Sequence, residues 1–343
     1  MSADVTVGIP TKNRYDTLVQ TLQSVAFQTL KPKHVIIVDD SDTPIDIRNL
    51  PAYQAVLGLF NEFGITWEVV FGSKRGQHIS HQFIQEKADT DWIWRIDDDE
   101  IAEPNVLRQL FDSLESELYE QIGAIGGLVI VPPVQLCPVD VGNVISDLMR
   151  PNIQWFKSTK EDCLIPVEHL TSSFLYRRGI AKYETGLSPA AHREETMFTY
   201  EIHRTGYDVL VNTSAVTWHL RNGTGGIRSH QDSRFWEQDE KLFHVKLKEW
   251  GINSEPTKLC VLDCGKGDHV IFKKLIPDLI KKYGKVVLAT CFPDVFDGDP
   301  VEQISIADAQ MRTPIDHYNI YKFCIDHQWK ESLEGAFRLM YGI

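Results

Sequence analysis

Residues 92–100 read Trp-Ile-Trp-Arg-Ile-Asp-Asp-Asp-Glu, a mostly apolar run that ends in four acidic side chains. The same pattern occurs at 35–42, where Val-Ile-Ile-Val precedes Asp-Asp-Ser-Asp. Short apolar runs bounded by polar residues are typical of buried strands in a parallel sheet. Ligands of such sheets bind beyond the carboxyl ends of the strands. The two acidic clusters therefore predict a site at that edge.

Strand and helix patterns alternate around these two runs. Further strands are expected at 5–10 and 66–71, and helices at 15–28 and 77–87. Later in the chain the pattern predicts short strands at 209–211 and 215–219 and helices at 232–250 and 269–283. This alternation predicts an α/β fold, a mostly parallel sheet flanked by helices.

Composition narrows the class of protein. The chain has 343 residues with 35 basic and 48 acidic side chains, a net charge of −13, which argues against a protein that coats nucleic acid. Its six cysteines include no Cys-x-x-Cys pair, and no apolar run is long enough to span a bilayer. We therefore expect a cytoplasmic protein with no disulfide framework and no structural zinc site.

Three consecutive aspartates at 97–99 call for compensating positive charge, because adjacent carboxylates repel and raise one another's pKa. A divalent cation with oxygen ligands, Mg²⁺ or Mn²⁺, is the natural partner. The alternative is that these aspartates only form turns or cap helices after their strands.

Residues 1–230 resemble the family 2 glycosyltransferases, which have the GT-A fold, a Rossmann-like sheet. The resemblance rests on the order of several motifs rather than on any one of them. These are the opening Ile9-Pro10-Thr11-Lys12-Asn13-Arg14, the segment Val38-Asp39-Asp40-Ser41, the D-x-D of Asp97-Asp98-Asp99, and Glu194-Glu195 followed by Gly206-Tyr207, with His219 downstream.

The resemblance implies a nucleotide-sugar donor and a metal ion. Asp97 and Asp99 would hold the metal, with His219 completing its shell, although a packed histidine is the alternative. Asp39 would accept a hydrogen bond from the base, which favours a UDP-sugar. The residues that would contact the donor are Pro10, Thr11, Asn13, Arg14, Asp39, Asp40, Arg75, Asp97, Asp98 and Arg228. Arg75 in a structural turn and Arg228 as a surface side chain are the alternatives.

The resemblance also implies that Glu195 is the general base of an inverting transfer, with Glu194 as the weaker candidate. A carboxylate there would take the proton of the acceptor hydroxyl as it attacks the anomeric carbon. Position 195 departs from the family, which usually has Asp there. A solvated pair of acids that favours the dipole of the helix is the alternative for Glu194 and Glu195.

The C-terminal part differs in character. Residues 231–257 are expected to form an amphipathic helix and a linker, and 258–343 a small α/β domain. The loop Asp263-Cys264-Gly265-Lys266-Gly267-Asp268-His269 faintly resembles a heptosyltransferase half-domain. About 85 residues are too few for a complete two-lobed transferase, so acceptor binding or oligomerisation is the expected role.

These observations predict a metal-dependent inverting glycosyltransferase that moves a hexosyl or pentosyl group to a hydroxyl of a glycan, small molecule or other polymer. A transferase for modified bases of viral DNA and a non-catalytic protein that binds nucleotide-sugars or acts as a scaffold stay open as alternatives. A nucleotidyltransferase is disfavoured, because residues 10–14 lack the expected Gly-rich loop.

Overall fold

The computed structural model describes residues 2–116, 121–132, 163–227, 233–252, 257–306, 309 and 319–343. The chain divides into two compact units, Met1–Phe243 and His244–Ile343. The division lies within helix α6 (Ser233–Glu249). No helix in the described ranges is long and apolar enough to cross a membrane.

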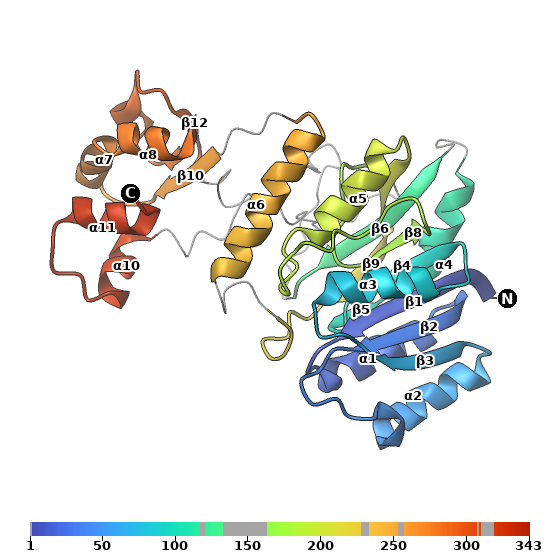
Figure 1. Ribbon diagram of the computed structural model, residues 1–343. Coiled ribbons are helices and arrows are strands. Elements are labelled where there is room, and N and C mark those ends of the chain that lie inside the picture. Colours follow the sequence, from blue (N-terminus) through green and yellow to red (C-terminus); the bar gives the residue numbers. More distant parts are fainter. Residues whose placement is uncertain are drawn as a thin grey trace. The chain divides into compact units, whose positions relative to one another are not determined.

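The first unit is built on a nine-stranded sheet with the order β3-β2-β1-β4-β8-β6-β9-β5 and with β7 beside β9. Strands β1 to β4, β6 and β9 run in one direction, and β5, β7 and β8 run in the other. The predicted mostly parallel α/β sheet is therefore confirmed (Figure 1). The strands are β1 (Ser2–Thr11), β2 (Lys31–Asp39), β3 (Thr66–Phe71), β4 (Trp92–Arg95), β5 (Glu100–Ala102), β6 (Ile122–Ile130), β7 (Leu164–Pro166), β8 (Phe174–Arg177) and β9 (Asp208–His219).

Both faces of this sheet are covered, as alternation along β2 shows. Val35 and Ile37 point into one core, whereas Ile36 and Val38 point into the other. Helices α1, α2 and α4 contribute to the first core, and α3 and α5 to the second. The helices of this unit are α1 (Tyr15–Ala26), α2 (Pro51–Glu62), α3 (Gln77–Lys87), α4 (Val106–Asp112) and α5 (Glu194–Arg204), with short 3-10 turns at Ile47–Asn49 and Ser113–Glu115.

Strand β9 corrects one expectation from the sequence. The two short strands predicted at 209–211 and 215–219 are a single strand with a register shift, since Gly126 pairs with Val211 and Leu128 with Val216. A Cβ atom on Gly127 would meet the carbonyl oxygen of Ala215 at 2.1 Å. The break in the apolar pattern is therefore a bulge packed against a glycine.

The second unit contains a small parallel sheet with the order β10-β11-β12. Its elements are β10 (Thr257–Leu262), α7 (Lys266–Lys273), α8 (Ile276–Tyr283), β11 (Lys285–Thr290), a 3-10 turn (Pro293–Phe296), β12 (Glu302–Ile304), α10 (Ile320–Asp326) and α11 (Leu333–Tyr341). The helix predicted at 269–283 is two helices, because Pro277 lacks the N–H of a helix interior and starts α8 instead.

Candidate active site

The two acidic clusters meet at one edge of the large sheet. Thr11 at the end of β1 is in register with Asp39 at the end of β2, and the backbone N–H of Asp40 donates to the carbonyl of Thr11 at 2.8 Å. Strand β4 pairs with the other side of β1. The hydroxyl of Thr11 donates to Asp98 Oδ2 at 2.7 Å. The parallel strands thus bring the cluster at Asp39 and Asp40 close to the cluster at Asp97 and Asp98, 58 positions further along the sequence.

Asp39 and Asp40 are both buried and hydrogen-bonded. Asp39 Oδ2 accepts a hydrogen bond from the hydroxyl of Tyr15 at 2.7 Å. Asp40 accepts from the hydroxyl of Ser80 at 2.7 Å and from the backbone N–H of Lys74 at 2.9 Å. Asp40 therefore holds the turn after β3 against the start of α3.

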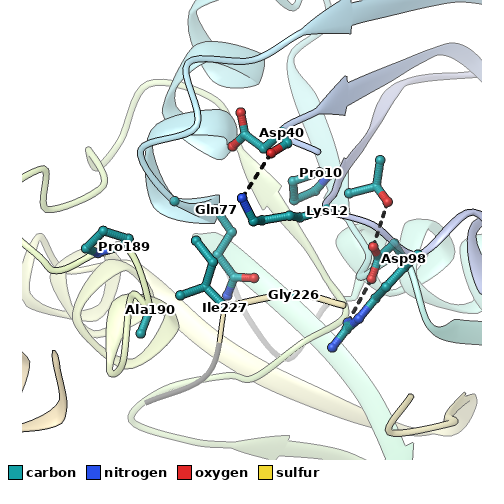
Figure 2. Close-up of a pocket in the computed structure, with 12 residues that line it drawn as sticks. Pro10, Lys12, Asp40, Gln77, Asp98, Pro189, Ala190, Gly226 and Ile227 are labelled. Atoms are coloured by element: carbon teal, nitrogen blue, oxygen red, sulfur yellow. Dashed lines mark hydrogen bonds and ion pairs between the residues drawn. The ribbon is translucent and has the colours of Figure 1, made fainter. Parts of the chain in front are cut away.

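An open pocket lies at this edge, at the carboxyl ends of β1 and β2 (Figure 2). Lys12 and Gln77 contribute polar groups that the sequence analysis did not assign. Lys12 Nζ lies 2.6 Å from Asp42 and 3.4 Å from the carbonyl oxygen of Asp40. The pocket is lined by Pro10, Thr11, Lys12, Arg14, Asp40, Gly76, Gln77, Asp98, Pro189, Ala190, Gly226 and Ile227.

Several predicted donor-binding residues are not part of this lining. Asn13 donates its side-chain amide to Asp42 at 2.8 Å. Arg75 is exposed in the turn that precedes α3. Its neighbour Gly76 has φ +114°, and a Cβ there would meet the carbonyl oxygen of Pro189 at 2.7 Å. The turn of 75–76 is therefore packed closely against the opposite wall of the pocket.

Arg14 is the positive partner of Asp97-Asp98-Asp99, the acidic motif of the site. Its Nη1 lies 2.9 Å from Asp98 Oδ1 and 3.2 Å from Asp99 Oδ1. Burial raises the pKa of Asp98 to about 6, even though Arg14 and the hydroxyl of Thr11 oppose the shift. Burial alone would also raise the pKa of Asp99, but His219 and Arg14 outweigh it and lower that pKa.

The loop of residues 221–226 closes over this motif from the end of β9. The backbone N–H of Asn222 donates to Asp99 Oδ2 at 2.8 Å, and Arg14 Nε donates to the carbonyl of Thr224 at 3.0 Å. The N–H of Gly226 donates to the carbonyl of Lys12 at 2.9 Å. The predicted donor-binding residue Arg228 lies outside the described residues.

His219 lies beside the acidic motif, where a metal ligand was expected. Its Nε2 is 3.4 Å from Asp99 Oδ1 and its Nδ1 is 4.0 Å from Glu100 Oε1. Burial alone would lower the pKa of His219, but these carboxylates raise it to about 9. The imidazole is therefore protonated at neutral pH and would have to lose that proton to bind a cation.

The oxygens at this position fit a hard cation. Asp97 Oδ1 and Asp99 Oδ1 are buried, and their near neighbours are ion-pair partners: Arg95 at Asp97, and Arg14 and His219 at Asp99. Buried carboxylate oxygens of this kind suit Mg²⁺ or Mn²⁺. Within the described ranges no three His, Cys, Asp or Glu side chains are arranged to hold a metal by themselves. A cation here would need further ligand oxygens from a bound molecule.

Glu194 and Glu195 begin helix α5. Glu194 is buried, and its Oε1 accepts a hydrogen bond from Gln77 Nε2 at 2.8 Å. Glu195 is 16% exposed, and its Oε1 accepts from the backbone N–H of Ser172 at 2.9 Å. Burial raises the pKa of Glu195 to about 7; Arg95 opposes this shift, and the Asp97 and Glu194 charges add to it. A carboxyl group with such a pKa is suited to accept a proton near neutral pH.

Arg95 joins the glutamate pair to the acidic motif, and the sequence analysis missed it. Its Nη2 lies 2.5 Å from Glu194 Oε1, 2.6 Å from Glu195 Oε1 and 3.5 Å from Asp97 Oδ1. The arginine is fully buried. Its signal in the sequence is a lone charge within the apolar run of 92–96, since a buried charge needs partners.

Helix α6 supports the far wall of the pocket. Asp239, which is fully buried, accepts hydrogen bonds from the backbone N–H of Ser188 at 2.6 Å and from its hydroxyl at 2.7 Å. The loop of residues 188–193 carries Pro189 and Ala190 of the pocket and leads directly into Glu194. This part of α6, within the helix predicted at 232–250, therefore belongs to the site of the first unit, whereas the sequence analysis placed the helix outside the catalytic residues 1–230.

Residues 6–126 match the family model described as Glycosyl transferase family 2. The match includes β1, β2, β4 and the acidic motif, so the resemblance is supported there. It ends before Glu194 and Glu195 and does not reach the heptosyltransferase-like loop, whose resemblance is not confirmed. No curated protein matches the chain.

Several solved structures are similar to this chain. GalNAc-T7 with UDP, GalNAc and Mn²⁺ is 16% identical over 64% of this chain and 44% of its own, with a TM-score of 0.49. TarS from S. aureus is 14% identical over 81% and 44%, with a TM-score of 0.47. The mannosyltransferase PcManGT from Pyrobaculum calidifontis, in complex with GDP-Man and Mn²⁺, is 16% identical over 65% and 59%, with a TM-score of 0.45. The chain spans about half the length of these proteins.

Proposed function

We propose that this chain is a metal-dependent inverting glycosyltransferase that uses a nucleotide-sugar, with UDP as the expected nucleotide, and an acceptor hydroxyl. The family match over residues 6–126 supports glycosyl transfer as the reaction class. One observation carries the proposal: Arg95 contacts both Asp97 of the acidic motif and Glu195. The pKa of Glu195, about 7, suits a general base.

The acidic edge is the proposed donor site. Asp97, Asp99 and deprotonated His219 would hold a divalent cation only together with oxygens of the bound donor, and the cation would supply Lewis-acid stabilisation of the leaving diphosphate. Lys12 and Arg14 line the pocket and bring further positive charge to the same place. Asp39 would accept a hydrogen bond from the N3–H of uracil.

Glu195 is the proposed base on the acceptor side. Among the residues that the structure describes, Arg95 and the N–H of Ser172 both donate to Oε1, so Oε2 is the proposed acceptor of the proton of the acceptor hydroxyl. The hydroxyl then attacks the anomeric carbon opposite the leaving diphosphate, and a single displacement of this kind inverts the configuration. Glutamate reaches one methylene further than the aspartate usual in the family.

Calorimetric titration with UDP, GDP, ADP and CMP, in Mn²⁺ and in EDTA, tests the donor site. Release of UDP from UDP-sugars, with water as the acceptor, then measures turnover without a known acceptor. Glu195→Gln should keep nucleotide binding and lose at least about 100-fold in turnover, since general base catalysis contributes 10²–10⁴-fold. Glu201→Gln, a half-buried acid on the same helix that pairs with Arg204 and not with Arg95, is the matched control and should behave as wild type.

Failure of every nucleotide to bind, both in Mn²⁺ and in EDTA, would overturn the donor site and favour a scaffold role. Wild-type turnover by Glu195→Gln would remove Glu195 as the base.

A further inference from the structure

Arg95 has no direct part in the chemistry proposed above, yet it is a fully buried charge in the middle of the site. Burying a guanidinium is unfavourable unless its partners are well placed. Its neighbours along the chain, Trp94 and Ile96, are apolar and fully buried. An apolar residue would satisfy packing alone at this position, so the charge itself calls for an explanation.

One nitrogen of Arg95 contacts both glutamates. The Oε1 atoms of Glu194 and Glu195 lie 2.5 and 2.6 Å from Nη2. Two successive carboxylates at the start of a helix repel one another and would turn apart in the absence of a shared cation. Arg95 therefore makes both side chains point to the same place.

The position of the guanidinium is fixed by the sheet. Arg95 pairs with Gly8 of β1 on one side and with Phe174 of β8 on the other. Its guanidinium carbon also lies 5.4 Å from the centre of the Phe174 ring. A group mounted on a central strand is held more rigidly than one on a loop.

The same guanidinium contacts the acidic motif, since Asp97 Oδ1 lies 3.5 Å from Nη2. The donor-side carboxylate and the candidate base thus share one rigid positive group, although they are 98 residues apart.

We propose that Arg95 is a positioning residue that holds the Glu195 carboxylate at a fixed distance from the acidic motif, so that Oε2 faces the acceptor. This inference rests on the proposed function of Glu195 as the base. It predicts that the geometry of Arg95 matters as well as its charge, because Nη2 makes all three contacts and the flexible stem of a lysine would not hold its nitrogen at the position of Nη2.

The test compares Arg95→Lys in the wild-type background and in the Glu195→Gln background. Turnover is measured as UDP release in Mn²⁺, with calorimetric affinity for UDP and the melting temperature as companion readouts.

In the wild-type background we expect kcat to fall about 10–100-fold, because a misplaced catalytic group slows the reaction by about this factor. The affinity for UDP should stay within about threefold of the wild-type value. In the Glu195→Gln background we expect no further loss, because residues that act as a unit are not additive. Arg177→Lys, the same change at an exposed position of β8, is the matched control.

The outcomes separate this inference from the proposed function. An inactive wild type that binds no nucleotide overturns the proposed function. An active wild type with an equal loss from Arg95→Lys in both backgrounds, or with no loss at all, overturns the inference alone. If Arg95→Lys does not fold, the double variant Arg95→Met with Glu194→Gln replaces it in the test. This double variant removes one positive and one negative charge, so the net charge of the buried cluster is unchanged. Wild-type kcat in that double variant, or failure of both variants to fold, would make Arg95 a structural counter-ion and overturn its positioning role.

Discussion

Arg14 Nη1 lies 3.2 Å from Asp99 Oδ1, so the carboxylate proposed to hold a metal ion already has a positive partner. The same nitrogen is 2.9 Å from Asp98 Oδ1. The rest of the guanidinium is bonded to the loop above, through the carbonyl of Thr224. Arg14 therefore stabilises the acidic motif in the absence of a cation and would repel a cation that approaches it.

Removing this charge should strengthen metal binding. For Arg14→Gln we expect the affinity for Mn²⁺ in the absence of nucleotide to rise about tenfold, because a like charge within a few ångströms is lost. Calorimetric titration with MnCl₂ measures the change, and Arg48→Gln at an exposed position is the control. Weaker Mn²⁺ binding by Arg14→Gln would mean that Arg14 preorganises the site rather than competing for it.

The pH dependence of turnover should report on Glu195. Its pKa is raised to about 7, chiefly by burial, and the base is active only when deprotonated. We therefore expect kcat/KM to rise about tenfold per pH unit from pH 5 to near pH 7 and then to level off. A profile of UDP release at saturating Mn²⁺ tests this. A rate that is flat from pH 5 upward would contradict the raised pKa.

Much of the fold follows from local patterns. The apolar runs ending in Asp39 and Asp97 identify β2 and β4 because burial on both faces leaves few polar residues in a strand. Strand β5 (Glu100–Ala102) was missed because three residues carry no periodicity. The reversed direction of β8 was also missed, since direction depends on connections through the middle of the chain rather than on the strand itself.

The site was predictable only where its residues are close in sequence. The aspartates stand next to the strands that position them, so the edge on which they lie could be inferred. Arg95 was missed because its partners Glu194 and Glu195 are about 100 residues away. Asp239 was missed for the same reason, since it holds Ser188 from a helix 51 residues further on.

Glu240 should stabilise the first unit in a pH-dependent way. It lies 2.5 Å from Arg193 Nε and 2.9 Å from His192 Nε2. Burial alone would raise its pKa, but these partners lower it to about 2. A lowered carboxyl pKa gives stability that is present above the unfolded value near 4.5 and is lost as the pH falls toward 2.

For Glu240→Gln we expect a loss of about 1–3 kcal/mol at pH 7, because Arg193 loses the charge of a mostly buried partner. The deficit against wild type should shrink in melts below pH 4. Glu237→Gln, an exposed acid on the same helix, should melt as wild type at both pH values. An equal deficit at pH 7 and pH 3 would show that packing, not charge, is responsible.

The close approach of Gly76 to the loop of residues 188–193 gives a last prediction. A Cβ on Gly76 would meet Pro189 O at 2.7 Å and His78 Cε1 at 2.9 Å, and its φ of +114° is unfavourable for any other residue. Gly76→Ala should push the pocket wall outward and weaken UDP binding in Mn²⁺ by at least about tenfold, since a displacement near 1 Å disrupts a preformed site. Gly64→Ala is the matched control, because Gly64 also has a positive φ, +71°, but nothing lies within 4 Å of its Cβ. It should lose about 1 kcal/mol of stability from backbone strain and keep its UDP affinity. Equal UDP affinities in the two variants would show that the contact with Pro189 does not shape the pocket.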